Sequence, residues 1–171
     1  MKLFPFAAAA LALLAVHPAS AQTDAKGTVD SFDKSLLDVM KNAEKLGYQG
    51  RFDKFDPVIN KVYDIPLMTR ISVGPQWSSL TPDQQTKVTE AFKKLSIATY
   101  ASRFDGYGGE SFQITGESPA NGGDEIIDVY LSGTISQLAN YRSEFAATLR
   151  SGGADALVDL INKKVADEGA K

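Results

Sequence analysis

The sequence lacks cysteine, and its one histidine, His17, lies in an N-terminal segment that we expect to be removed. The remaining chain therefore has no cysteine or histidine nucleophile, no Ser-His-Asp triad, and no zinc, haem or iron–sulfur site of the usual kind. The lack of cysteine also excludes disulfides and a lipoprotein anchor, so the fold has to be held by packing alone. We expect no cofactor.

The first residues have the three parts of a secretory signal peptide. Lys2 supplies the positive charge, residues 3–16 form an apolar run, and Ala19-Ser20-Ala21 is a small-residue cleavage site before Gln22. The apolar run is too short to span a bilayer of about 30 Å. We expect residues 1–21 to be a cleaved signal peptide and residues 22–171 to form a single exported, periplasmic domain.

Clustered basic charge is also missing. The full chain has a net charge of −3, and removal of Lys2 makes it one unit more negative. Nucleic-acid phosphates require clustered Lys and Arg, so the sequence gives no electrostatic basis for binding nucleic acid.

Apolar residues recur at helical spacing along most of the chain. The clearest helix start is Thr81-Pro82-Asp83-Gln84, which combines an N-cap, a proline at N1 and the glutamine of a capping box. Thr134-Ile135-Ser136-Gln137 repeats the pattern. The expected helices cover approximately residues 28–46, 55–62, 67–72, 81–102, 134–149 and a short segment after residue 153.

Between the last two long helices the composition becomes rich in glycine. Residues 111–115 and 125–131 alternate in the manner of strands. No segment of 20–50 residues repeats, so the sequence predicts one α+β domain in which helices dominate.

Carboxylates are the only strong acid–base groups left. The notable ones are Asp105 with Glu110, and the group Asp124, Glu125 and Asp128. Solvated loop charge is the simplest interpretation, because Asp and Glu are mostly exposed. The 105–110 loop lacks the alternating ligands of a calcium site, and we expect no metal site.

Large apolar residues concentrate before the glycine-rich region. They are Phe55, Tyr63, Met68, Phe92, Tyr100, Phe104, Tyr107 and Phe112. From the residues alone, an ordinary core is favoured over a ligand cavity, since large apolar residues at helical spacing usually fill a core.

Four segments carry a family resemblance: residues 63–68 (YDIPLM), 73–77 (VGPQW), 80–85 (LTPDQQ) and 97–104 (IATYASRF), together with Phe92. In these the chain resembles the toluene-tolerance or MlaC family, and within it the hopanoid biosynthesis-associated HpnM branch. The resemblance extends from about residue 28 to residue 165.

This resemblance implies a periplasmic carrier that shuttles a lipid, either a phospholipid or a hopanoid. Its implied partners are an inner-membrane ABC transporter complex and an outer-membrane lipoprotein complex, and we expect a monomer that is not an enzyme. The implied fold packs helices over a small curved antiparallel sheet, as in an NTF2-like cone. The implied lipid-binding residues are Val62, Met68, Ile71, Phe92, Tyr100, Phe112, Ile114 and Val129.

One feature departs from the family pattern. Only residues 116–124 separate the two expected strands, so the sheet is shortened, and two strands make a marginal sheet without helical cover. Two alternatives to a carrier stay open. One is a non-catalytic structural adaptor of the transporter, and the other is a small cone-fold acid/base enzyme that uses Asp105 or Glu110 with Tyr107.

Overall fold

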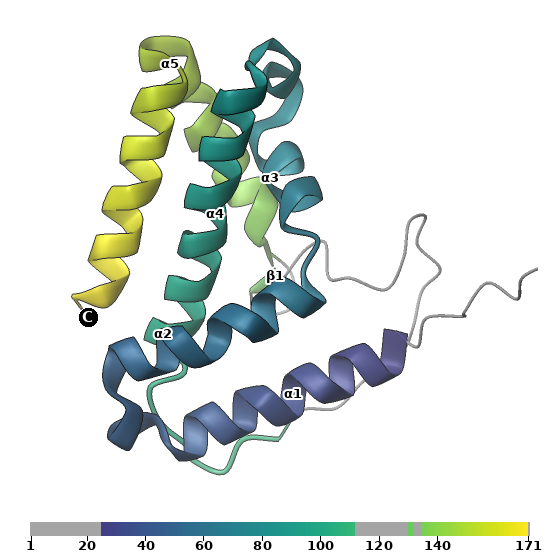
Figure 1. Cartoon of the computed structure of the whole chain (residues 1–171), viewed down its shortest axis with the longest axis vertical. Helices are drawn as coiled ribbons and strands as arrows, with labels where there is room; N and C mark the ends of the chain where they lie inside the picture. The colour runs from purple at the N-terminus through teal and green to yellow at the C-terminus, as the bar shows by residue number, and fades with distance from the viewer. Residues whose placement is uncertain (1–24, 112–129, 132–134, 171) are drawn as a thin grey trace, which may run out of the picture.

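The structure, a computed structural model, describes residues 25–111, 130–131 and 135–170. Helices make up almost all of this part of the chain (Figure 1). The elements are α1 (Ala25–Lys41), α2 (Ala43–Val62), α3 (Ile65–Val73), the 3₁₀ helix η1 (Gly74–Ser79), α4 (Pro82–Arg103), β1 (Tyr130–Leu131), β2 (Ile135–Ser136) and α5 (Gln137–Gly169).

The first two helices form one end of the molecule. In Figure 1, α1 lies alongside α2, and α2 crosses the end of α4. Sequence analysis predicted one helix over residues 28–46, but α1 ends at Lys41 and Gly47 lies within α2 as a kink. Gly47 has φ 59°, a left-handed conformation that is strained for residues with a Cβ. This kink turns the rest of α2 across the molecule.

A stop-and-start motif joins α2 to α3. Tyr63 is the C-cap of α2, and Asp64 is the N-cap of α3, where its carboxylate accepts a hydrogen bond of 2.9 Å from the Leu67 backbone N–H. Pro66 occupies the first turn of α3, where a backbone N–H would have no partner within the helix, so the lack of one in proline costs nothing. The short helix expected at residues 67–72 is therefore confirmed and begins two residues earlier.

The capping box predicted for α4 is confirmed. The Gln84 backbone N–H donates to the Thr81 hydroxyl at 3.3 Å, and the Thr81 N–H donates to the Gln84 side-chain oxygen at 2.9 Å. These two bonds satisfy donors that a helix N-terminus leaves free. The start of the longest uninterrupted helix in the described residues is thus set by local sequence.

The last helix, α5, consists of two arms that meet at Gly153. Gly153 has φ 72°, so the helical path is broken and the chain turns back along α4 (Figure 1). At the end of the second arm, a Cβ on Gly169 would lie 3.1 Å from the Tyr48 ring of α2. The C-terminal arm of α5 therefore packs against α4, and its end lies next to Tyr48 near the start of α2.

The α+β prediction is wrong. The only strands in the described part of the chain are β1 and β2, two residues each, which pair antiparallel with Tyr130 opposite Ser136 and Leu131 opposite Ile135. A pair this short offers no face on which helices can pack. Helices instead pack on helices, so the architecture is helical rather than helices over a curved antiparallel sheet.

The predictions for the residues around this strand pair are only partly testable. Ile135 and Ser136, which were expected to start the last helix, form β2, and α5 begins at Gln137. Thr134 and residues 112–129, with most of the expected strands, lie outside the described residues.

The core lies where α2, α3 and α5 pack around α4. Its largest side chains with under 2% exposure include Phe55 and Ile59 from α2, Phe92 from α4, and Phe145 and Leu157 from the two arms of α5. Burial of each such side chain stabilises the fold by about 1.5–3 kcal/mol. With no cysteine present, this packing is the main source of stability.

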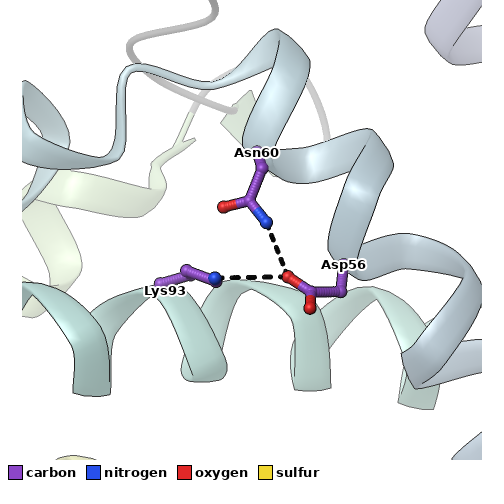
Figure 2. Close-up of polar contacts among 3 residues, drawn as sticks. All are labelled: Asp56, Asn60 and Lys93. Atoms are coloured by element: carbon purple, nitrogen blue, oxygen red, sulfur yellow. Dashed lines mark hydrogen bonds and ion pairs between the residues drawn. The ribbon is translucent and has the colours of Figure 1, made fainter.

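Two polar contacts connect α2 to α4. At the surface, Asp56 accepts a hydrogen bond of 2.6 Å from Asn60 and lies 3.3 Å from the Lys93 ammonium (Figure 2). Such exposed pairs contribute little, about 0–1 kcal/mol. Beneath the surface, Arg51 is only 9% exposed, and it is the stronger link.

The Arg51 guanidinium connects the ends of three helices. Its Nε donates to the Ala101 carbonyl in the last turn of α4 at 2.7 Å, and its Nη1 donates to the Ala43 carbonyl at the α1–α2 junction at 3.1 Å. Carbonyls in a last helical turn lack intrahelical donors and carry partial negative charge. The buried cation is therefore matched at Ala101 to an acceptor that needs a donor, and its second bond goes to the first residue of its own helix.

We expect Arg51→Met to lower the free energy of unfolding by about 2–4 kcal/mol, because two buried carbonyls lose charged donors. Urea titration followed by circular dichroism measures this change. Lys54→Met on the exposed side of the same helix is the matched control and should stay within about 0.5 kcal/mol. Equal stabilities of the two variants would show that the Arg51 contacts contribute no more than an exposed cation.

Candidate functional site

Five aromatic rings gather where α1, α2 and α4 meet. We call them the tyrosine cluster: Phe32, Phe55, Tyr63, Tyr100 and Phe104. Tyr100 is its centre, with ring centroids 5.5 Å from Phe32, 5.7 Å from Phe55, 6.0 Å from Tyr63 and 5.4 Å from Phe104. The Phe104 ring is stacked on Tyr100, and Phe32 and Tyr63 meet it edge to face, the geometries that aromatic pairs prefer.

Local backbone structure holds the two tyrosines in place. Tyr63 is the C-cap of α2, where its N–H donates to the Ile59 carbonyl at 3.0 Å. Tyr100 lies in the last turn of α4, and the Phe104 N–H donates to its carbonyl at 3.0 Å. Arg51 fixes that same last turn through Ala101. Both rings thus sit at helix ends that specific contacts secure.

The hydroxyls of Tyr63 and Tyr100 are hydrogen-bonded to each other. Burial raises the pKa of Tyr63 well above its usual range, and the neighbouring Tyr100 hydroxyl adds to the rise. Burial also raises the pKa of Tyr100, an effect that the bond from Tyr63 and the charge of Arg103 oppose and that Asp33 reinforces. Both phenols are therefore neutral at physiological pH and keep their protons as donors.

The predicted lipid-binding residues fall into three groups. Val62 and Met68 are buried, with 2% and 3% exposure, whereas Ile71 and Tyr100 are partly exposed, and all four belong to or pack against the same hydrophobic core. Phe112, Ile114 and Val129 lie outside the described residues.

Phe92 lies apart from Tyr100. It is 1% exposed and meets Tyr141 and Phe145 of α5 edge to face, with centroids 5.8 Å and 6.4 Å away. Eight residues separate it from Tyr100, or about 12 Å along a helix. Phe92 therefore contributes to the packing of α4 on α5, whereas Tyr100 belongs to the tyrosine cluster.

Sequence analysis did not select Phe32 or the hydroxyl pair. Phe32 belonged only to the apolar stripe of the first helix, yet it contacts both tyrosines, with centroids 5.8 Å from Tyr63 and 5.5 Å from Tyr100. The only sign in the sequence was that Phe32 is an aromatic residue among the aliphatic residues at helical spacing in the first helix. Side chains from three separate helices meet here, and helical spacing within one segment cannot reveal that.

The residues of the enzyme alternative lie at the surface. Tyr107 is 45% exposed, with the Lys41 ammonium 5.2 Å from its ring centroid. Glu110 is exposed and accepts a hydrogen bond of 2.6 Å from the Gly108 N–H within its own loop, and Asp105 is exposed as well. Among the described residues, no group of three or more acidic side chains is placed to hold a metal ion.

Two open hollows accompany these features. One, of about 500 Å³, lies between the end of α1 and the loop after α4, and its lining includes Met40, Lys41, Asp105 and Tyr107. The other, of about 380 Å³, lies between α4 and α5 and is lined by Leu95, Tyr141, Lys164, Asp167 and Glu168. Both have charged rims, so neither matches the apolar interior that the sequence predicts for a lipid.

None of the helices in the described part of the chain is long and apolar enough to cross a membrane.

Comparison with known proteins gives one family and one fold. The profile of the family described as "MlaC protein" matches residues 30–126 and 118–163. Among solved structures, the phospholipid-binding protein from Ralstonia solanacearum, determined in complex with a phospholipid, is similar with a TM-score of 0.69 and 23% sequence identity. The match covers 87% of this chain and 100% of that one, which shows a shared fold. A search of curated proteins found no significant match.

We expect Phe92→Ala to lower the free energy of unfolding by about 3–5 kcal/mol, because the deletion leaves a cavity between α4 and α5. Thermal melting measures the loss. Tyr107→Ala, which removes an exposed ring, is the control and should melt close to the wild type. A Phe92→Ala protein that melts normally but has lost its ligand would instead assign Phe92 to a binding cleft.

Proposed function

This chain belongs to the MlaC family, and from that premise we propose that it is a periplasmic carrier that binds a lipid in its apolar interior. The observation that carries the proposal is the extent of the family match, which runs from residue 30 to residue 163 and so includes all of α2, α3 and α4 and most of α1 and α5. The solved relative with the same fold holds a phospholipid, which supports a phospholipid as the ligand. A hopanoid is the second candidate ligand, suggested by the resemblance to the HpnM branch.

The proposed lipid contacts are the apolar side chains around the meeting point of α2, α3 and α4. We propose that Val62, Met68, Ile71 and Tyr100 contact the lipid from this region, and that Phe112, Ile114 and Val129 add to it from outside the described residues. Phe92 is proposed to contact lipid only if the packing of α4 on α5 opens.

Transfer energetics explain why such a protein would act as a shuttle. Removing a lipid tail from water is favourable by about 0.8 kcal/mol per CH₂, or on the order of 13 kcal/mol for roughly 16 carbons. A bilayer offers the tail the same gain. The carrier therefore lowers the barrier to crossing an aqueous gap, and direction has to come from partners. We propose an inner-membrane ABC transporter complex and an outer-membrane lipoprotein complex for that role.

We propose no catalytic function, because the carboxylates of the enzyme alternative, Asp105 and Glu110, are exposed to solvent with Tyr107 beside them. General acid–base catalysis in a binding cleft usually relies on partly buried groups.

The lipid itself is the first test. Protein purified from periplasmic extract should release a stoichiometric lipid into chloroform, and mass spectrometry identifies it as a phospholipid or a hopanoid. Ile71→Glu should lower the amount bound, because it places a carboxylate beside acyl carbon. Leu160→Glu, a change at a similarly half-buried aliphatic residue of α5, is the matched control. A wild-type protein that yields no lipid would favour a structural adaptor.

Export is the second test. We propose that residues 1–21 direct the chain to the periplasm and are removed between Ala21 and Gln22. Intact-mass measurement on periplasmic material should give a chain that begins at Gln22. Retention of Met1, or recovery of the protein only from the cytoplasm, would contradict a periplasmic carrier.

A further inference from the structure

The hydroxyl pair of the tyrosine cluster has more donors than it can use internally. Each phenol has one O–H proton, and each oxygen can also accept. The bond between Tyr63 and Tyr100 consumes one of the two protons. No atom of the described residues accepts the second, although both side chains are largely buried and buried donors are normally paired.

The burial of the two rings indicates which proton is left over. Tyr63 is 4% exposed, and the only acceptor within its reach in the described structure is the Tyr100 oxygen. Tyr100 is partly exposed, so of the two residues it is the one that a bound molecule can approach more easily. Either hydroxyl can donate in this bond. We infer that Tyr63, the more buried residue, donates to Tyr100, which leaves the Tyr100 proton for another acceptor.

The surroundings of Tyr100 are apolar on most sides. Phe32, Phe55 and Phe104 surround the ring, and none of them offers a hydrogen-bonding atom in its side chain. Asp33 and Arg103 are near enough to affect the pKa of Tyr100, but neither is hydrogen-bonded to its hydroxyl within the described residues. A donor in apolar surroundings gains more from an acceptor than the same donor in water does.

We propose that Tyr100 donates a hydrogen bond to an oxygen of the bound lipid, and that the Tyr63–Tyr100 pair is a polar subsite within the apolar binding region. This inference rests on the proposed carrier function and deepens it. The shared chemistry required of the ligand is an acceptor oxygen next to hydrocarbon, either the ester carbonyl of an acyl chain or the phosphate of a headgroup. A lipid that is hydrocarbon alone at this position leaves the Tyr100 proton unpaired.

The test compares three lipids that separate the two acceptors. A diester phosphatidylcholine has both, its diether analogue keeps the phosphate but lacks the carbonyls, and a diacylglycerol of the same chain length keeps the carbonyls but lacks the phosphate. Affinities are measured on delipidated full-length protein by competition with a fluorescent phospholipid. Tyr100→Phe removes only the hydroxyl, and Tyr107→Phe, at an exposed ring outside the cluster, is the matched control.

We expect Tyr100→Phe to weaken binding about fivefold, the loss of one neutral hydrogen bond, for the two lipids that carry the acceptor that Tyr100 uses and not for the third. Loss confined to the diester lipid and diacylglycerol supports a carbonyl acceptor, and loss confined to the two phospholipids supports the phosphate. Any other pattern, including equal loss for all three or no loss, overturns the subsite.

Tyr63→Phe gives an independent readout, because Tyr100 then still has its proton. Its affinities for all three lipids should stay within about twofold of the wild type, less than the effect of one lost hydrogen bond. A loss as large as that of Tyr100→Phe would contradict the assignment of Tyr100 as the donor to the ligand. If the wild type binds none of the three lipids, the proposed function as a phospholipid carrier fails and the subsite with it. If it binds them all and Tyr100→Phe changes nothing, only the subsite fails.

Discussion

The buried guanidinium of Arg51 is the contact on which the arrangement of this end of the molecule depends. It joins the last turn of α4 to the junction of α1 and α2 through two backbone carbonyls. Tyr100 precedes the bonded carbonyl of Ala101 by one residue, so the centre of the tyrosine cluster is held by the same contact. At Ala101, in the last turn of α4, the cation meets the partial negative charge of a helix C-terminus without burying a carboxylate beside it.

Local sequence predicted a helix end that depends on neighbouring residues. Thr81 with Gln84 specifies the start of α4, because each bond of the capping box spans only a few residues. The caps at Tyr63 and Asp64, which mark the change from α2 to α3, were not predicted. The sheet prediction was wrong because it also relied on short local patterns. Alternation over a few residues is a weak signal, and the same capping pattern that is correct at Thr81 placed Ile135 and Ser136 in a helix where they form β2.

The candidate site was predicted only in part, since it is made of contacts between distant segments. Val62, Met68, Ile71 and Tyr100 were selected by their match to a family, and the structure shows where they lie. The bond between the Tyr63 and Tyr100 hydroxyls joins positions 37 residues apart, and Phe32 reaches them from a third helix. No periodic pattern within one segment encodes such a meeting. Phe92 was selected as a lipid contact, but in the structure it packs against two rings of α5. Its spacing along the helix is the same in both cases, so the sequence cannot distinguish them.

The reversal of α5 at Gly153 affects the order in which the chain can fold. The second arm supplies Leu157 and Ile161, both fully buried, and its end at Gly169 lies against Tyr48. These residues follow all the other helices in the chain order of the described elements, so the core cannot close before the second arm has formed. Contacts between the two ends of a chain also form slowly, because a long loop has to be ordered first. The helices that precede Gly153 therefore leave the core open on one side until the second arm of α5 folds back onto them.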